Sequence, residues 1–358
     1  MIPIVYLTSG LLPLVTALVA TAGLTFLLLP VIKKLGLIDD PKRHKHPGII
    51  HTKPIPRAGG IPLFFGCLIA GLFFLPVNQI TIALFFAGFI SLAIGLIDDK
   101  LNAQSKDVSP YLRFLIQILT AIIVVGSGVS IHFITSPSGG LLHFDTIKVL
   151  TLSLADLLSI IWLVWVMNML NWSKGVDGQM PGIVAISALV IGLLSLRLNP
   201  TGSLIDTKLS FIIAGSAIGF LLFNFYPAKI FPGYSATSLY LLLGAAAILS
   251  SAKLATAILV MGVPTVDAIF TIIRRIVSKR SPFFHDKKHL HHLLLRLGYS
   301  QRQIALFYWC ISAIVGIASF TLTSRSKIFA MIMVIVITVG ILLFLHIVTR
   351  NANEKISS

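Results

Sequence analysis

The most unusual stretch of this sequence is "HDKKHLHHLL", residues 285–294, which places four histidines, two lysines and one aspartate in ten positions. If residues 285–297 form a helix, leucines occupy one stripe and basic side chains occupy another. The two stripes are Leu290, Leu293, Leu294 and Leu297, and His285, His289, His292 and Arg296. So many imidazole and ammonium donors beside so few acids favour a pocket for a phosphate or diphosphate group.

Two other interpretations of this stretch stay open. Histidines four residues apart on a helix could bind zinc, although no cysteine supports such a site and five nearby basic residues would repel a cation. Those five are Lys279, Arg280, Lys287, Lys288 and Arg296. Alternatively, the leucines lie in a membrane interface and the basic stripe faces the cytosol as a plain amphipathic surface.

Carboxylates and amides suited to chemistry occur in two further stretches. Asp98 and Asp99 follow an apolar run directly; adjacent carboxylates can bind Mg²⁺ or handle a proton, or they can simply mark a helix end that meets water. Asn168, Asn171 and Asp177 stand around two glycines, where they suit nucleotide or metal-water contacts. Helix capping and a turn would also explain these residue types.

Composition indicates which kind of scaffold must position these groups. The chain has 358 residues, a mean hydropathy of +0.95, 56% hydrophobic residues and only 11% charged residues, which is typical of a polytopic membrane protein. Its two cysteines lie in apolar runs, so neither a disulfide framework nor a thiolate zinc site is expected. Residues 11–32 are long enough to span a membrane and lack a small-residue cleavage site, so no removable signal peptide is expected.

Apolar runs of about 17–25 residues predict an all-α fold of about 10–11 transmembrane helices in one domain, residues 1–358. The expected spans are 11–32, 58–76, 79–97, 111–131, 150–167, 182–197, 209–225, 236–250, 254–273, 303–322 and 328–348. Alternating them across the bilayer places 22 of the 28 Lys and Arg on one side, which the positive-inside rule makes cytoplasmic. The net charge of +16 therefore reflects topology, and no nucleic-acid partner is expected.

The same face gathers most of the acids and all of the unusual loops. Nine of the twelve Asp and Glu lie there: Asp39, Asp40, Asp98, Asp99, Asp107, Asp177, Asp267, Asp286 and Glu354. Polar loops that converge at one membrane face suit a site that joins a water-soluble substrate to a lipid-borne one. A transporter, the alternative, would place ionisable residues near the bilayer midplane, where Asp156 and Asp267 are the only candidates.

Six motifs, in this order, resemble those of the polyprenyl-phosphate N-acetylhexosamine-1-phosphate transferases. They are "H.KPIPRAGG" (51–60), "G.IDD" (95–99), "N..N...GVDG" (168–178), "FN..PAKIF.G" (223–233), "VPTVDAIFTIIRR" (263–275) and "SPFF.DKKHLHH" (281–292). The "PRAGG" and "HLHH" elements are more similar to the enterobacterial-antigen and teichoic-acid initiating branch than to the muramoyl-pentapeptide branch.

This resemblance implies a plasma-membrane enzyme that initiates cell-envelope polysaccharide synthesis and has its site at the cytoplasmic face. A homodimer is the oligomeric state considered for it. Undecaprenyl or another polyprenyl phosphate would attack a UDP-N-acetylhexosamine, such as UDP-GlcNAc, and release UMP. Asp98 and Asp99 would be catalytic, and Asp99 and Asp177 would hold Mg²⁺ or Mn²⁺. Substrate contacts would come from Lys53, Arg57, Asn168, Asn171, Asn224, His289, His291 and His292.

Two positions depart from the family pattern. Lys174 stands where the usual "N..N..DG.DG" has its first aspartate, and Tyr234 replaces the aspartate that the family uses to ligate Mg²⁺. A phenol, with an ordinary pKa of about 10, is a poor Mg²⁺ ligand near neutral pH. The chain is therefore either an active transferase with a rearranged site or a degenerate member that binds lipid phosphate or nucleotide without turnover.

Overall fold

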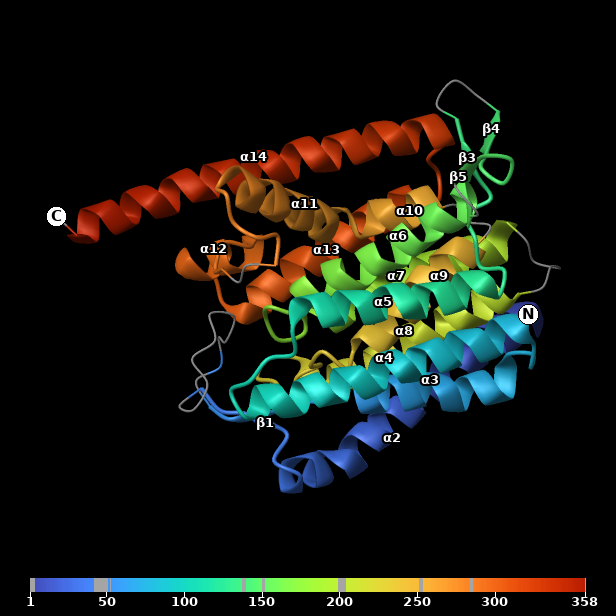
Figure 1. Cartoon of the computed structure of the whole chain (residues 1–358), viewed down its shortest axis with the longest axis horizontal. Coiled ribbons are helices and arrows are strands. Elements are labelled where there is room, and N and C mark those ends of the chain that lie inside the picture. The colour runs from blue at the N-terminus through green and yellow to red at the C-terminus, as the bar shows by residue number, and fades with distance from the viewer. Residues whose placement is uncertain are drawn as a thin grey trace.

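The computed structural model describes residues 4–41, 51, 53–136, 140–149, 152–198, 204–250, 254–283 and 286–357. Long helices run side by side along one common direction, and their connections gather at the two ends of the bundle (Figure 1). The β1 strand and α12 lie at one end, and β3, β4 and β5 lie at the other (Figure 1). The end that carries β1 and α12 is called the site end below.

The helices are α1 (Ile4–Tyr6), the π-helix η1 (Leu7–Leu11), α2 (Leu12–Lys34), α3 (Gly60–Phe74), α4 (Gln79–Ala103), α5 (Pro110–Gly126), α6 (Leu154–Trp172), α7 (Gln179–Leu198), α8 (Ile205–Asn224), α9 (Thr237–Leu249), α10 (Leu254–Val260), α11 (Gly262–Val277), α12 (Leu290–Arg296), α13 (Gln301–Ala318) and α14 (Ser324–Ser357). In the described parts of their connections, three antiparallel pairs of short strands occur: β1 (Ile38–Asp39) with β2 (Ile55–Pro56), β3 (Phe133–Thr135) with β4 (Leu141–His143), and β5 (Lys148–Val149) with β6 (Leu152–Ser153).

Among the described residues, seven helical segments are long and apolar enough to cross a membrane, and the pair α10–α11 forms an eighth that is bent by 77°. Three shorter apolar helices, α3, α5 and α9, complete the bundle. Each of the eleven spans expected from the sequence coincides with one of these helices or with the bent pair. The prediction of an all-α, multi-pass membrane protein is therefore confirmed.

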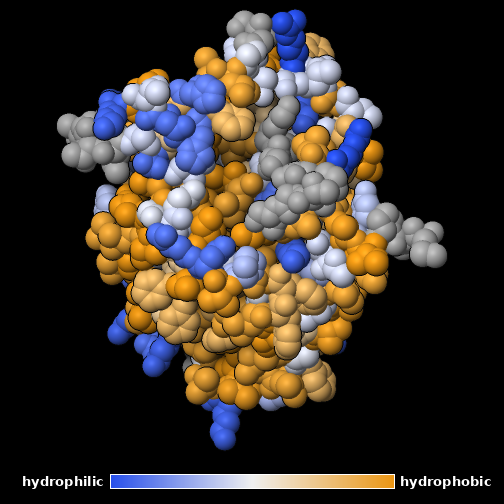
Figure 2. All heavy atoms as spheres, turned by 90° about the vertical axis from the view of Figure 1, so that its right-hand side faces the viewer, coloured by the Kyte–Doolittle hydropathy of each residue, from blue (hydrophilic) through white to orange (hydrophobic). Residues whose placement is uncertain are grey.

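Burial separates a central layer from a peripheral one. In α7 and α8, 72% and 67% of the apolar window is buried, compared with 22% in the first span and 17% in α14. The α8 helix packs against α2, α3, α7 and α9. Seen from the end opposite the site, hydrophobic residues predominate, with hydrophilic residues scattered among them (Figure 2). Large hydrophobic side chains are exposed along α2 and α14, and such apolar flanks are what lipid tails solvate.

Side-chain caps fix where several helices begin. The Asn78 side chain accepts a hydrogen bond from the Thr81 amide (2.9 Å) before α4, and the Ser153 side chain accepts one from the Asp156 amide (3.1 Å) before α6. Ser300 forms a capping box before α13. Because these caps satisfy amides that a helix cannot pair internally, they set which residues of α4 and α6 reach the site end.

The bend between α10 and α11 lays a polar helix face beside the site. It occurs at Met261, and Gly262 and Pro264 follow at once. On α11 the buried polar residues fall four apart: Asp267, Thr271 and Arg275. The exposed residues of the same helix are apolar: Ile269, Ile273, Ile276 and Val277. The straight span expected over 254–273 is therefore replaced by a broken one.

The structure corrects the helix expected over 285–297. The α12 helix covers only Leu290–Arg296, with His289 as its N-cap, and His285 lies outside the described residues. His289, His291 and His292 are buried together with Leu290 and Leu293. The interpretation of a plain amphipathic surface with a cytosol-facing basic stripe is therefore wrong, because both sides of this short helix pack into the protein.

Candidate active site

A cavity of about 210 Å³ opens at the site end of the bundle. Residues from the β1–β2 region, α4, α5, α6, the two loops around Lys174 and Tyr234, and α11 to α12 line it. Seven of the site residues expected from the sequence are among them: Arg57, Asp98, Asn168, Asn171, His289, His291 and His292. Lys53 is exposed and does not line the cavity.

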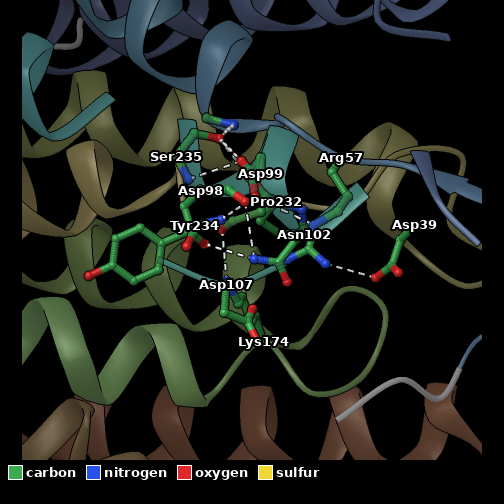
Figure 3. Close-up of polar contacts among 12 residues, drawn as sticks. Asp39, Arg57, Asp98, Asp99, Asn102, Asp107, Lys174, Pro232, Tyr234 and Ser235 are labelled. Carbon is green, nitrogen blue, oxygen red and sulfur yellow. Dashed lines mark hydrogen bonds and ion pairs between the residues drawn. The ribbon is translucent and has the colours of Figure 1, made fainter. Parts of the chain in front are cut away.

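The two adjacent carboxylates at the end of α4 face different surroundings (Figure 3). Asp99 is fully buried and accepts hydrogen bonds from the Tyr234 amide (2.8 Å), the Ser235 amide (3.2 Å) and the Ser235 hydroxyl (2.7 Å). Asp98 lines the cavity and forms an ion pair with Arg113. Asp99 therefore anchors the loop 231–236, and Asp98 is the carboxylate available to a ligand.

Backbone contacts explain why this loop can approach Asp99 so closely. The Phe231 amide donates to the Pro56 carbonyl (2.7 Å) and the Gly60 amide donates to the Pro232 carbonyl (3.1 Å). Gly233 has a φ of +72°, and a Cβ placed on it would overlap the Asp99 carboxylate. Only glycine combines the left-handed backbone with this contact.

We expect Gly233→Ala to lower thermal stability and to disrupt the site. Gly36→Ala is the matched control, because Gly36 has a φ of +70° but has no atom within 4 Å of the added Cβ. The left-handed backbone costs about 1–2 kcal/mol at both positions, so the additional loss at Gly233 measures the contact with Asp99. Equal unfolding temperatures for the two variants in detergent would contradict the described packing.

Each arginine at the cavity has a carboxylate partner. Arg57 pairs with Asp39 (2.8 Å), Arg113 pairs with Asp98, and Arg275 pairs with Asp286 (3.2 Å). The buried Nε atoms of Arg57 and Arg113 nevertheless make no hydrogen bond within the described part of the chain. Guanidinium N–H groups that are not fully used in hydrogen bonds, at a cavity wall, suit an oxyanion ligand.

Lys174 differs from these arginines, because no described carboxylate forms an ion pair with it. Its Nζ donates to the Gly233 carbonyl (2.9 Å) and lies 5.8 Å from the centroid of the Tyr234 ring. Burial and the nearby Arg57 lower its pKa to about 7, although Asp99 and Asp98 oppose this shift. An anion bound in the cavity would favour the ammonium form.

Tyr234 closes one wall of the cavity through its side chain. Its hydroxyl accepts a hydrogen bond from Gln117 Nε2 (2.9 Å), and Gln117 Oε1 accepts one from Asn168 Nδ2 (2.6 Å). The Arg113 guanidinium lies 5.0 Å from the ring centroid. Burial raises the pKa of the phenol well above its ordinary value, so Tyr234 stays protonated and neutral.

Sequence reasoning missed Arg113 and Gln117, which both serve this site. The available signal was two polar side chains four residues apart, in a segment that is otherwise apolar and begins on the side that the basic residues predict to be cytoplasmic. Such a pair shares one helix face and is expected to face protein or water, not lipid.

Three histidines of the opening motif, His289, His291 and His292, form a packed group. His289 Nδ1 lies 2.8 Å from Asp267 Oδ2, and the rings of His289 and His291 are parallel within 5°. Burial lowers the pKa of His291 well below its usual value and, together with His289, lowers that of His292 to about 4. His291 and His292 can therefore offer hydrogen bonds near neutral pH without adding positive charge.

Buried neutral histidines make stability depend on acid. In the unfolded chain His292 becomes protonated below about pH 6.5, whereas in the native protein it stays neutral down to about pH 4. The free energy of unfolding therefore decreases as the pH falls through this window. The loss for His292 amounts to roughly 3 kcal/mol. His292→Asn should flatten the decline in unfolding temperature, and His143→Asn, an exposed position at the opposite end, should leave it unchanged. Identical profiles for all three proteins would contradict this assignment.

Asp177 and Asn224 lie beside the cavity and not on it. Asp177 Oδ2 accepts a hydrogen bond from the Ala228 amide (2.9 Å), and its Oδ1 lies 3.6 Å from His51 Nε2. Burial raises the pKa of Asp177, although His51 opposes this shift. Asn224 Oδ1 accepts a hydrogen bond from the Gly178 amide, and its Nδ2 donates one to the Ile230 carbonyl. Both residues hold the loops that frame the cavity.

These donors do not fit the Mg²⁺ site expected from the resemblance. Asp99 and Asp177 are enclosed by different segments, and neither lines the cavity. Within the described ranges, no group of three His, Cys, Asp or Glu side chains could hold a metal ion. Asp98, which does line the cavity, is already paired with the Arg113 guanidinium.

Comparison with known proteins identifies the chain's relatives. Residues 81–251 match the family model described as glycosyl transferase family 4. A probable undecaprenyl-phosphate N-acetylglucosaminyl 1-phosphate transferase of Bacillus subtilis is 30% identical over 98% of this chain and 96% of its own length. The decaprenyl-phosphate N-acetylglucosaminephosphotransferase of Mycolicibacterium smegmatis is 33% identical over 85% and 81%.

A third relative, the phospho-N-acetylmuramoyl-pentapeptide-transferase of Borrelia turicatae, is 30% identical over 78% of this chain and 83% of its own. The likeness thus extends over the whole bundle and includes every loop that contributes to the cavity. The resemblance seen in the six motifs is confirmed, and the chain belongs to glycosyl transferase family 4, the membrane-embedded polyprenyl-phosphate N-acetylhexosamine-1-phosphate transferases.

Proposed function

We propose that this protein transfers N-acetylglucosamine 1-phosphate from UDP-N-acetylglucosamine to a polyprenyl phosphate and releases UMP, the first step of a cell-envelope polysaccharide. The observation that carries the proposal is the cavity at the site end, where Arg57, Arg113 and Lys174 meet Asp98 next to an apolar membrane-embedded bundle. Relatives of this chain bear the names of enzymes that use undecaprenyl and decaprenyl phosphate.

The transfer is a displacement at the β-phosphorus of the donor. An oxygen of the lipid phosphate forms a new P–O bond to that phosphorus, the bond from the phosphorus to the bridging oxygen breaks, and the electron pair leaves on UMP. A dianionic lipid phosphate has no proton to lose, and a monoanionic one would pass its proton to Asp98. We assign Asp99 a positioning role, because it holds the Tyr234–Ser235 backbone.

Neutral polar groups complete the site around the charged ones. The Oδ1 atom of Asn171 and the Nδ1 atom of His291 are buried and have no hydrogen-bond partner within the described residues, although both side chains line the cavity. Buried polar atoms without a partner are costly, so they mark contacts reserved for a ligand. We assign them to the sugar nucleotide, whose amide and hydroxyl groups can both donate and accept.

The experiment that tests this function incubates the purified protein with radiolabelled UDP-N-acetylglucosamine and undecaprenyl phosphate and counts the label that becomes extractable into organic solvent. Lipid-dependent label is the expected result. The control omits the lipid phosphate, and a second donor, UDP-glucose, tests recognition of the acetamido group. Absence of lipid-linked label, with the nucleotide still bound, would favour the degenerate interpretation.

We also propose that the site end faces the cytoplasm and that the protein resides in the plasma membrane, as a homodimer. The distribution of basic residues supports this orientation. In a background without reactive cysteines, Ser281→Cys should resist an impermeant thiol reagent in intact cells, and Thr146→Cys, exposed beyond β4, should react. The opposite labelling pattern would reverse the topology and remove the site from the cytosolic pool of sugar nucleotide.

A further inference from the structure

We infer that this protein binds and transfers the sugar phosphate without a divalent metal ion, because the Lys174 side chain, together with Arg57 and Arg113, supplies the positive charge that the diphosphate needs. The inference rests on the proposed function, since it concerns the same diphosphate site. It goes beyond that function by naming what compensates the charge of the donor.

Every described carboxylate that lines the cavity is already ion-paired with an arginine, which leaves Mg²⁺ without a free ligand. The pairs are Asp39 with Arg57, Asp98 and Asp107 with Arg113, and Asp286 with Arg274 and Arg275. Asp99 accepts three hydrogen bonds from the loop 234–235, and its Oδ1 also lies 3.4 Å from the Arg57 Nε. Asp98 is paired with Arg113 and accepts a hydrogen bond from Asn102 Nδ2 (3.2 Å). Mg²⁺ demands octahedral oxygen ligands, so binding here would require it to displace fixed guanidinium and amide donors.

The Lys174 ammonium has unused capacity beside the cavity. Of its three N–H groups, one is engaged by the Gly233 carbonyl at 2.9 Å. Asp98 and Asp99 are near enough to influence its electrostatics, yet neither forms an ion pair with it. A like-charged metal ion placed near the same two carboxylates would be repelled by this ammonium.

Tyr234 supports the lysine and is not merely a lost ligand. Its ring lies beneath both cations, 5.0 Å from the Arg113 guanidinium carbon and 5.8 Å from the Lys174 Nζ. The negative face of an aromatic ring attracts such cations. Lys174 and Tyr234, the two departures from the family pattern, therefore act as one unit that places the lysine amine at the cavity wall, where a bound diphosphate favours its charged form.

Cationic side chains can neutralise the negative charge of a diphosphate in the same way as a metal ion. Preorganised charges aimed at the oxygens that gain negative charge stabilise the displacement without any reorganisation. Lys174, Arg57 and Arg113 each line the cavity and come from three different segments, so they can contact different oxygens of one diphosphate. In this arrangement a cationic side chain of the protein stabilises the negative charge that develops on the leaving UMP oxygen.

The test compares binding and turnover in excess EDTA and in millimolar MgCl₂. Affinity for UDP and the transfer rate of the unaltered protein should be the same in both. Lys174→Met should weaken UDP binding in EDTA by roughly 10-fold to 100-fold, whereas Lys174→Arg should retain it. Size-exclusion profiles and unfolding temperatures show whether each variant is folded. If Lys174→Met does not fold, Lys174→Arg still tests whether the positive charge at this position is sufficient for UDP binding in EDTA.

The outcomes separate this inference from the proposed function. Transfer that requires Mg²⁺ overturns metal independence and leaves the function intact. If no transfer occurs in either buffer, the proposed function fails, and UDP binding then tests metal independence alone. Binding that is insensitive to EDTA and depends on Lys174 supports the metal-free site. Binding that requires Mg²⁺ overturns it. The double variant Lys174→Asp with Tyr234→Asp adds two carboxylates and removes the ammonium, so its UDP binding should become Mg²⁺-dependent.

Discussion

Replacing Asp98 with asparagine should lower the turnover number by about 10²-fold to 10⁴-fold, the range that a positioned acid–base group contributes. Asp98 is the member of the adjacent pair that lines the cavity. Asparagine retains the size of the side chain, but it replaces one accepting oxygen with an NH₂ donor and removes both the charge that holds Arg113 and the group that can take a proton. The measurement is the initial rate of lipid-linked label formation with both substrates saturating.

Asp99→Asn provides the informative comparison for this prediction. Because Asp99 accepts hydrogen bonds from Tyr234 and Ser235, its variant should lose thermal stability as well as activity. Asp98→Asn should lose activity with a smaller fall in unfolding temperature, because Arg113 keeps Asp107 as a second partner at 3.6 Å. If the two variants exchange these phenotypes, the roles assigned here are reversed.

The second large effect concerns Lys174 and pH. Loss of its charge in Lys174→Met should reduce kcat/KM by about 10²-fold to 10³-fold, as the removal of one preorganised charge-stabilising donor does. In the unaltered protein the ammonium is present below the pKa of about 7 and is lost above it. Because kcat/KM reports the free enzyme, it should fall about tenfold per pH unit above that value.

Lys174→Arg is the control for the pH dependence. A guanidinium stays protonated throughout the neutral range, so this variant should show no alkaline fall. The charged groups that influence Lys174 are Arg57 and Arg113, which lower its pKa, and Asp98 and Asp99, which raise it. A fall that persists unchanged in Lys174→Arg would assign the titration to another group.

Long apolar runs made the helical fold predictable. The spans of α2, α4, α7 and α8 follow from segment length and composition alone, because a helix that crosses lipid must satisfy every backbone group internally. The 77° bend between α10 and α11 did not follow, since composition does not show where a helix turns to cover a site. The truncated α12 was missed for a related reason: Asp267, remote in sequence, binds both His289 and the Leu290 amide.

Residue types located much of the cavity but did not assign roles within it. Asp98, Asn168 and Asn171 could be selected because polar groups at the end of an apolar helix are unusual. Spacing could not show that Asp99 faces away from the cavity, because that depends on a loop more than 130 residues later in the chain. Neutral, buried histidines were also not foreseeable, since burial by distant helices sets their protonation.

The most direct test of the proposed transfer follows the β-phosphorus of the donor. UDP-N-acetylglucosamine labelled with ³²P at the β-phosphate is incubated with the purified protein and undecaprenyl phosphate, and both the lipid product and the released nucleotide are analysed. Sugar-phosphate transfer predicts that the ³²P enters the lipid fraction and that unlabelled UMP appears in equal amount. Labelled UDP in the aqueous fraction, with a lipid product that lacks ³²P, would contradict the reaction proposed here.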